Sequence, residues 1–331
     1  MRCSSKFIVR ALIAFVISSL SACVSYPDAP APIASPVLAG NVLQTGDGQL
    51  LAARAWRAEK PKAILVALHG MNDYSHTFAM AAPWWMQDAD ITVYAIDQRG
   101  FGGSPAFGRW VGGETLKADL RAAVEAARAA HPGLPIFVLG HSMGAAVIMA
   151  AEADAPLGAD GLILAAPGVW GGDALPPSHR LAANVAATIA PGKTLTGERA
   201  GRQPTDNIEV LREMAADPKV IKETRLDAVL GVVRIMGEAF DNAEKVCTDA
   251  LVLIGARDDI IPHKAMESAA GRLCGAVDIH RYPEGWHLLF RDHQREAVWR
   301  GVAGWIEWKT RGLNIIEAER DKETGSLAAP R

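Results

Sequence analysis

The sequence predicts an α/β fold in which a mostly parallel sheet is covered by helices on both faces, with a helical insertion late in the chain. Strand-like apolar runs alternate with helical patterns, the order that a parallel sheet requires. With 331 residues, half of them hydrophobic, the chain can bury a large core. The expected strands are residues 63–68, 92–96, 136–139, 161–165, 250–254 and 277–282.

The elements before and between these strands follow from local patterns. Residues 42–44 and 50–56 flank a Gly-rich turn and predict a hairpin. The clearest helix is 115–130, which has an apolar face of Leu116, Leu120, Val124 and Ala127. On this helix the side chains expected to point away from the core are Asp119, Arg121, Glu125 and Arg128.

The alternation stops between Pro167 and Val246. This stretch has several helical patterns and no strand-like run, which predicts a helical lid at about residues 168–246, over the ends of the strands. Its most apolar helix, between Leu226 and Phe240, can pack the core of the lid, line a substrate pocket, or do both.

The N-terminus has the pattern of a targeting signal. Positive charges precede an apolar stretch, residues 11–20, that is too short and too closely flanked by charge to be a stable membrane span. The sequence Leu20-Ser21-Ala22-Cys23 resembles the lipobox of bacterial lipoproteins. That resemblance implies removal of residues 1–22, lipid attachment at Cys23 and, since no aspartate follows, a place in the outer membrane facing the periplasm. The alternative is an ordinary secretory signal with an incidental cysteine.

The remaining regions divide the mature chain into three parts. Residues 23–40 are rich in Pro and Ala and predict a semi-extended tether. Residues 41–312 form the expected domain, and residues 313–331 are expected to be disordered. A net charge of -3 gives no basic footprint, so nucleic acid is not an expected partner.

Two cysteines remain within the domain, Cys247 and Cys274. Each lies just before an expected strand. If the two strands are parallel neighbours, both cysteines lie at the same edge of the sheet within bridging reach. The sequence thus predicts a disulfide, with two buried thiols as the alternative.

The motif Gly140-His141-Ser142-Met143-Gly144 follows an expected strand and precedes an apolar helix. This arrangement places a serine on a sharp strand-to-helix turn with its hydroxyl exposed. Glycines are needed two residues away on either side because the two backbones pass too closely for side chains. Ser142 is therefore the predicted nucleophile.

The serine motif resembles the nucleophile elbow of the α/β-hydrolases, whose acid and histidine follow in chain order, each just beyond a strand end. After the strand 250–254, Asp258 fits the family pattern Gly-x-x-Asp, and Asp259 is its rival. After the last strand, His287 lies in a glycine-bearing loop. The competing histidines sit elsewhere: within the last strand, at the closing helix, beyond Pro262, and beside the nucleophile (His280, His293, His263 and His141).

An acyl-transfer site also needs two backbone N–H groups to stabilise an oxyanion. Met143 follows the nucleophile directly, and Met71 lies in the loop His69-Gly70-Met71-Asn72-Asp73 after the first buried strand. We expect the N–H groups of these two residues to form the oxyanion hole, with His69 and Gly70 shaping the loop. His69 can instead be an ordinary loop histidine.

Over residues 42–311 the chain resembles the monoacylglycerol lipase and lysophospholipase branch of the α/β-hydrolases, a branch also described as serine aminopeptidase-like. The resemblance rests on His69-Gly70, the stretch Asp97 to Ser104, the Gly140–Gly144 motif, Gly255-x-x-Asp258 and His287, and more weakly on the lid stretch 206–220. Met71 departs from it, since many members have a smaller residue there.

The resemblance implies a serine hydrolase that cleaves carboxylic esters of single-chain lipids through an acyl-enzyme, without metal or other cofactor. The alternatives are an aminopeptidase or amidase, which needs an acidic group in the lid such as Glu209, Glu213 or Glu223, and a non-catalytic binding protein. The histidines and carboxylates show no metal-ligand spacing.

Overall fold

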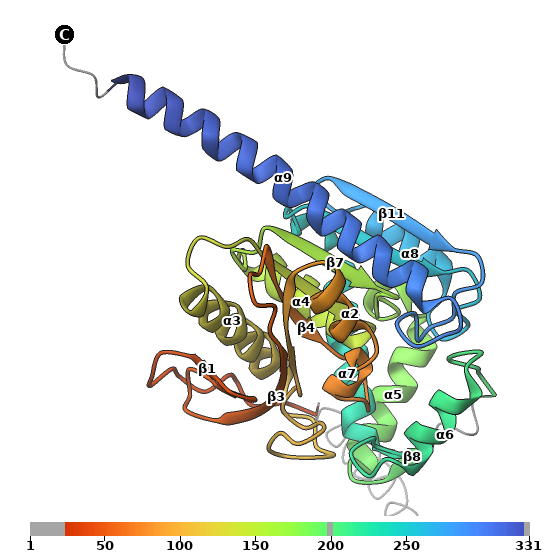
Figure 1. The fold of residues 1–331 in the computed structure, drawn as a ribbon. Helices are drawn as coiled ribbons and strands as arrows, with labels where there is room; N and C mark the ends of the chain where they lie inside the picture. The colour runs from red at the N-terminus through yellow and green to blue at the C-terminus, as the bar shows by residue number, and fades with distance from the viewer. Residues whose placement is uncertain (1–23, 197–200, 328–331) are drawn as a thin grey trace, which may run out of the picture.

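A computed structural model describes residues 24–196 and 201–327 of the chain (Figure 1). Its centre is a nine-stranded sheet with the strand order β1-β2-β3-β5-β4-β6-β7-β10-β11. Strands β5, β4, β6, β7, β10 and β11 run parallel, and β1, β2 and β3 pair antiparallel at one edge. The predicted α/β class with a mostly parallel sheet is confirmed. The strands are β1 Val37–Ala39, β2 Val42–Gln44, β3 Leu50–Trp56, β4 Ala63–Leu68, β5 Ile91–Ile96, β6 Ile136–His141, β7 Gly161–Ala165, β10 Ala250–Gly255 and β11 Val277–Tyr282.

The central strands are apolar throughout because both faces of the sheet are covered. Along β4, Ile64 and Val66 face one core and Leu65 and Ala67 face the other. The first core contains α3 (Gly113–Ala130), α4 (Met143–Asp154) and α8 (His263–Ala270). The second contains η1 (Ser75–Phe78), α2 (Ala81–Asp88) and the first half of α9 (Arg295–Leu327).

Two details of this core differ from the sequence prediction. Asp119 on α3 is buried, whereas its helical position predicted an outward side chain. The guanidinium of Arg99 donates to both of its oxygens, at 3.0 and 2.7 Å, and so makes burial of the carboxylate possible. Strand β1 was also missed, because three residues are too few to show an alternation.

The insertion after β7 consists of η2 (Gly172–Ala174), α5 (Pro177–Ile189), β8 (Thr194–Thr196), α6 (Ile208–Ala216), β9 (Glu223–Arg225), α7 (Leu226–Asp241) and η4 (Ala243–Lys245). The prediction that it lacks strands is wrong, since β8 and β9 pair antiparallel. Each has only three residues, too few for an apolar pattern. Helix α7 packs Ile235, Met236 and Ala239 into the core that contains α4, so this part of its apolar face is core.

Hydrogen bonds join the insertion to loops at the carboxyl ends of β4, β10 and β11. They are Ile221 N–H to Asn72 O (2.9 Å), Arg202 Nη1 to Ile260 O (2.8 Å) and Leu288 N–H to Pro204 O (2.9 Å). The insertion therefore crosses the edge of the sheet at which the predicted site residues lie.

Both ends of the described chain differ from expectation. Residues 24–36, which we call the strap, lie against the domain: the backbone N–H groups of Ile33 and Ala34 both donate to Gly46 O, at 2.6 and 3.0 Å. At the other end, α9 continues as a helix to Leu327, where disorder was predicted from residue 313, and projects from the domain (Figure 1). Within this distal part, Glu, Ala, Arg and Lys, which have high helix propensity, occupy six of the seven positions 317–323. The predicted signal 1–22 and Cys23 lie outside the described residues.

Among the helices of the described residues, none is both long and apolar enough to cross a membrane.

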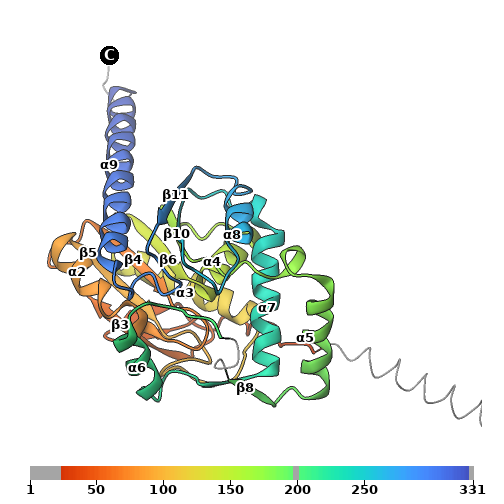
Figure 2. The same ribbon diagram turned by 90° about the vertical axis from the view of Figure 1, so that its right-hand side faces the viewer.

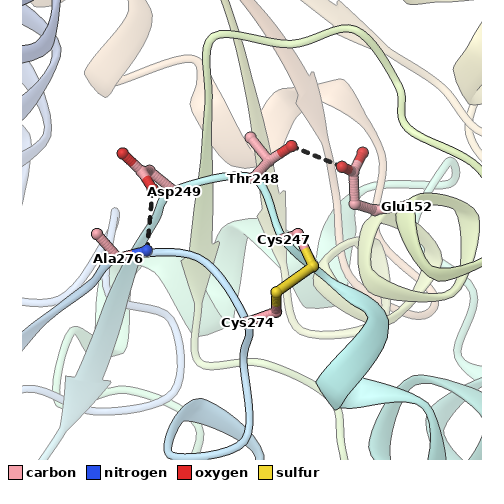
Figure 3. Close-up of a disulfide and its surroundings, with 6 residues drawn as sticks. All are labelled: Glu152, Cys247, Thr248, Asp249, Cys274 and Ala276. Carbon is pink, nitrogen blue, oxygen red and sulfur yellow. Dashed lines mark hydrogen bonds between the residues drawn. A yellow bond between two sulfur atoms is a disulfide. The ribbon is translucent and has the colours of Figure 1, made fainter.

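Cys247 and Cys274 form a disulfide, as predicted, with their Cα atoms 4.4 Å apart (Figure 3). The prediction assumed that the two strands after these cysteines are parallel neighbours. Strands β10 and β11 are parallel neighbours, with Ala250 opposite Val277. The same two segments are joined just beyond the bridge by a hydrogen bond, which the backbone N–H of Ala276 donates to the carboxylate of Asp249 at 2.9 Å.

Candidate active site

Ser142 lies on the sharp turn between β6 and α4. Its φ is 52°, in the left-handed region that non-glycine residues rarely adopt. The flanking glycines are required by contact: a Cβ on Gly140 would lie 2.4 Å from the nitrogen of Ala145, and one on Gly144 would lie 2.5 Å from Leu68 O. The close passage of strand and helix inferred from the motif is present.

The structure brings the three predicted catalytic side chains into one hydrogen-bonded chain. His287 Nε2 lies 3.0 Å from Ser142 Oγ, and His287 Nδ1 lies 2.8 Å from Asp258 Oδ2. Because an ionised carboxylate only accepts hydrogen bonds, Nδ1 carries the proton and Nε2 presents its lone pair to the serine hydroxyl. This arrangement can remove a proton from Ser142.

Asp258 and its rival Asp259 differ in environment. Asp258 is buried and accepts the N–H groups of Ile260 and Ile261 through Oδ1, at 2.8 and 3.1 Å. Burial opposes its ionisation, but the nearby His287 and the hydrogen bonds outweigh it and lower the pKa of Asp258. Asp259 is exposed and accepts the N–H of Gln203 at 3.2 Å, whereas Nδ1 of His287 is bonded to Asp258.

His141, one of the histidines that compete with His287 in the sequence, lies in contact with the catalytic histidine. Its Nε2 lies 2.9 Å from the backbone oxygen of His287, and the two rings are 5.0 Å apart between centroids. Burial lowers the pKa of His141 to about 3, so the ring is neutral and Nε2–H donates. Sequence reasoning missed this support of the His287 loop.

The loop after β4 lies against the elbow. A Cβ on Gly70 would be 3.2 Å from Ser142 Cβ, so only glycine lets the loop approach without displacing neighbours. His69 is fully buried: its Nε2 accepts the N–H of Gln98 at 3.0 Å, and its Nδ1–H donates to Gly70 O at 2.8 Å. The C=O of Gly70 and the N–H of Met71 belong to one trans peptide and point in opposite directions. By holding the carbonyl, His69 sets the direction of the Met71 N–H.

The two predicted oxyanion donors have no competing acceptor among the described residues. Met143 is the first residue of α4, where the N–H groups have no intrahelical partner. Neither its N–H nor that of Met71 donates to a protein atom in the described part of the chain. Both N–H groups are thus available to a ligand.

A buried ion pair joins the Met71 loop to the His287 loop. The guanidinium of Arg291 donates to the carboxylate of Asp73 and, at 3.2 Å, to Thr77 Oγ1. Thr77 Oγ1 itself donates to Asp73 at 2.5 Å. Attraction to Arg291 and hydrogen bonds outweigh burial and lower the pKa of Asp73. No sequence pattern marks this pair, because its members are 218 residues apart.

The structure holds one further cluster of acidic groups in its described part, away from Ser142. Glu114, Asp154 and Glu238 could in principle ligate a cation. The ammonium of Lys117 lies between them, 2.6 to 2.8 Å from each carboxylate, so the cluster is an ion-pair network that joins α3, α4 and α7.

Comparison with known proteins agrees with this geometry. A family model described as serine aminopeptidase, S33, matches residues 59–294. The chain is 29% identical to a monoacylglycerol lipase of Mycolicibacterium smegmatis over 74% of this chain and 88% of that protein. It is 28% identical to human monoglyceride lipase over 81% of this chain and 90% of that protein. The crystal structure of a monoacylglycerol lipase from Paleococcus ferrophilus superimposes with a TM-score of 0.66 at 22% identity, covering 79% and 98% of the two chains.

Proposed function

Because the chain belongs to the serine aminopeptidase S33 family of α/β-hydrolases, we propose that it is a serine hydrolase that cleaves carboxylic esters of single-chain lipids, such as monoacylglycerols or lysophospholipids. The observation that carries the proposal is the chain of hydrogen bonds from Ser142 through His287 to Asp258. Beside it are the N–H groups of Met71 and Met143, which donate to no protein atom within the described residues. The proposed chemistry needs no cofactor.

In the proposed mechanism Ser142 Oγ attacks the ester carbonyl while its proton passes to His287 Nε2. Asp258 holds the ring in the reactive tautomer and stabilises the imidazolium. The tetrahedral intermediate collapses, and the alcohol leaves with the proton from His287. Water, deprotonated by the same histidine, then attacks the acyl-enzyme and releases the fatty acid and free Ser142.

The oxyanion of each tetrahedral intermediate would accept from the N–H groups of Met71 and Met143. Loss of one such donor typically lowers kcat by about 10²–10³. His69 has an indirect part in this scheme, because it fixes the direction of the Met71 N–H.

An ester substrate is favoured over an aminoacyl amide by the surroundings of the acidic lid residues. All three candidates for holding a substrate ammonium are exposed and already bonded: Glu209 to Arg212, Glu213 to His76, and Glu223 to Thr194. The two relatives compared above by sequence identity are lipases of monoacylglycerols. Their names support a single-chain lipid ester as the substrate class.

We propose that the enzyme lies in the bacterial cell envelope, anchored through lipid on Cys23 and facing the periplasm from the outer membrane. The signal-like N-terminus and the motif at Cys23 support this. The Cys247–Cys274 disulfide also supports it, since such bonds persist in oxidising compartments.

The test is Ser142→Ala, with Ser268→Ala, an exposed serine on α8, as the matched control. We expect Ser142→Ala to abolish hydrolysis of a monoacylglycerol and labelling by a fluorophosphonate, with an unchanged circular dichroism spectrum, and Ser268→Ala to retain both activities. Wild-type turnover by Ser142→Ala would overturn the proposal. A panel of acyl glycerols and aminoacyl amides tests the substrate class, and preference for the amides would contradict it.

A further inference from the structure

The loop after β4 is hydrogen-bonded to the insertion at every second residue. Positions 72, 74 and 76 of the loop contact positions 224, 217 and 213 of the insertion, so the two segments run in opposite directions. The contacts are Asn72 Nδ2 to Thr224 Oγ1 (2.6 Å), Tyr74 Oη to Asp217 Oδ2 (2.6 Å) and His76 Nε2 to Glu213 Oε1 (2.5 Å). The elements α6 and β8 of the insertion lie at the end of the domain opposite the projecting end of α9 (Figure 2). The insertion is thus joined to the loop that carries the predicted oxyanion donor Met71.

Asn72, directly after Met71, is held by the insertion twice. Its side-chain amide donates to Thr224 Oγ1, and its backbone oxygen accepts the N–H of Ile221 at 2.9 Å. Met71 and Asn72 from the loop line one small cavity together with Ile221 and Thr224 from the insertion. The place of Asn72 therefore depends on contacts with β9 and the residues just before it.

The backbone of Asn72 has a conformation that glycine adopts more readily. Its φ is 65°, and it is the third residue of a turn in which the N–H of Asp73 donates to Gly70 O at 3.4 Å. A turn of type II requires a positive φ at this position, and glycine or asparagine is usual there. Asn72 Oδ1 is also buried without a hydrogen-bond partner among the described residues, a cost that glycine would avoid. The turn alone does not require this side chain, and its contact with Thr224 gives it a role.

Met71 is consequently fixed by both of its neighbours. Before it, His69 Nδ1–H holds the carbonyl of Gly70, and after it the insertion holds Asn72. A backbone donor stabilises an oxyanion only when it is aimed at the position where the charge develops. If Asn72 were released, the turn could rotate and the Met71 N–H would lose that direction.

We propose that Asn72 is a positioning residue of the oxyanion hole, and that its hydrogen bond to Thr224 keeps the Met71 N–H in the direction that the oxyanion requires. The inference rests on the proposed serine hydrolase function. Both tetrahedral intermediates of that reaction use the same donors. Loss of the Asn72–Thr224 bond therefore lowers kcat whether acylation or deacylation limits the rate.

The experiment measures kcat and KM of the full chain for the soluble ester p-nitrophenyl butyrate. Thr224→Val removes the hydroxyl that accepts from Asn72, and Thr224→Ser keeps it. The matched control is Thr194→Val, whose lost hydroxyl bonds to Glu223 within the insertion at 2.9 Å. We expect Thr224→Val to lower kcat about tenfold, less than the loss of a whole donor, with KM nearly unchanged. Both Thr224→Ser and Thr194→Val should retain most of the wild-type kcat.

A second arm removes the other partner of the same bond. Asn72→Gly, which keeps the turn, should lower kcat by about the same factor as Thr224→Val. The double variant should be no slower than Asn72→Gly alone, because the two substitutions break one bond. Losses that multiply to about 100-fold in the double variant would overturn the proposed bond.

The remaining outcomes separate this role from a structural one and from the proposed function. A raised KM with wild-type kcat in Thr224→Val would overturn the positioning role, since the bond would then only hold the insertion in place. A Thr224→Ser protein as slow as Thr224→Val would also overturn it. Wild-type turnover that Ser142→Ala abolishes, together with an unchanged kcat in Thr224→Val, overturns the positioning role alone. Absence of Ser142-dependent turnover in the wild type overturns the proposed function and this role together.

Discussion

Asp258→Asn is the substitution whose effect follows most directly from the hydrogen bonds of the site. Oδ1 of Asp258 accepts two backbone N–H groups, from Ile260 and Ile261, and Oδ2 faces His287 Nδ1. An asparagine must keep its carbonyl oxygen where Oδ1 stands, because an NH₂ group cannot accept those two hydrogen bonds. Its NH₂ group then donates to His287 Nδ1.

This reversal moves the proton of His287 to Nε2, the nitrogen that should accept from Ser142 Oγ. The histidine then cannot act as a base without a change of tautomer. We expect kcat to fall about 10⁴-fold, which corresponds to about 5.4 kcal/mol of lost transition-state stabilisation. If the carboxylate only positioned the ring, the amide would serve nearly as well and the loss would be about tenfold or less.

The assay is steady-state hydrolysis of p-nitrophenyl butyrate by Asp258→Asn from about pH 6 to 10, with unfolding in urea to verify the fold. Asp259→Asn is the matched control, since its carboxylate is exposed and bonded to Gln203, and we expect it to retain wild-type kcat. A loss of less than tenfold in Asp258→Asn, or an equal loss in Asp259→Asn, would refute the assignment of the acid.

Three other expectations follow from the same structure. Burial raises the pKa of Asp292 to about 7. Between about pH 4 and 7 the folded state therefore keeps a proton that the unfolded state loses. The free energy of unfolding falls as pH rises through this window. Asp292→Asn should therefore raise the urea unfolding free energy at pH 8 by up to about 4 kcal/mol and leave it unchanged near pH 3.5; an equal gain at both pH values would contradict the shift. Replacing Cys247 and Cys274 together by serine should lower the unfolding free energy by up to about 3.5 kcal/mol, because the bridge joins residues 27 apart, and an unchanged urea midpoint would count against it. His69→Ala should lower kcat by up to about 10²-fold, because the Met71 N–H would be misdirected. His69→Asn should recover part of the lost kcat, since its amide nitrogen can stand near the position of Nδ1. A rise in KM with no change in kcat would rule out a role for His69 in orienting the Met71 N–H.

The parts of the fold that were predictable are those with a strong local pattern. Strand β4 is a continuous apolar run because both faces of the sheet are covered, and its limits match the prediction. The burial of Asp119 was not predictable, because it depends on Arg99 from a separate loop. Strands β8 and β9 have three residues each, and no alternation is visible over that length.

The site divides in the same way. Ser142, Asp258 and His287 each sit in a short motif beside a strand end, so the order of motifs was enough to select them. His141 and Arg291 act through contacts with residues 146 and 218 positions away. Only the folded chain brings such pairs together, and a single sequence has no periodicity that marks them.

The central claim is that Ser142 carries the acyl group during turnover. Rapid acid quenching of the enzyme with a monoacylglycerol, followed by peptide mass spectrometry, measures this directly. The proposed mechanism predicts a mass increase equal to the acyl group on the peptide that contains Ser142, and its absence in Ser142→Ala. Continued ester hydrolysis with no acyl group on that peptide, or with the acyl group on another residue, would contradict it.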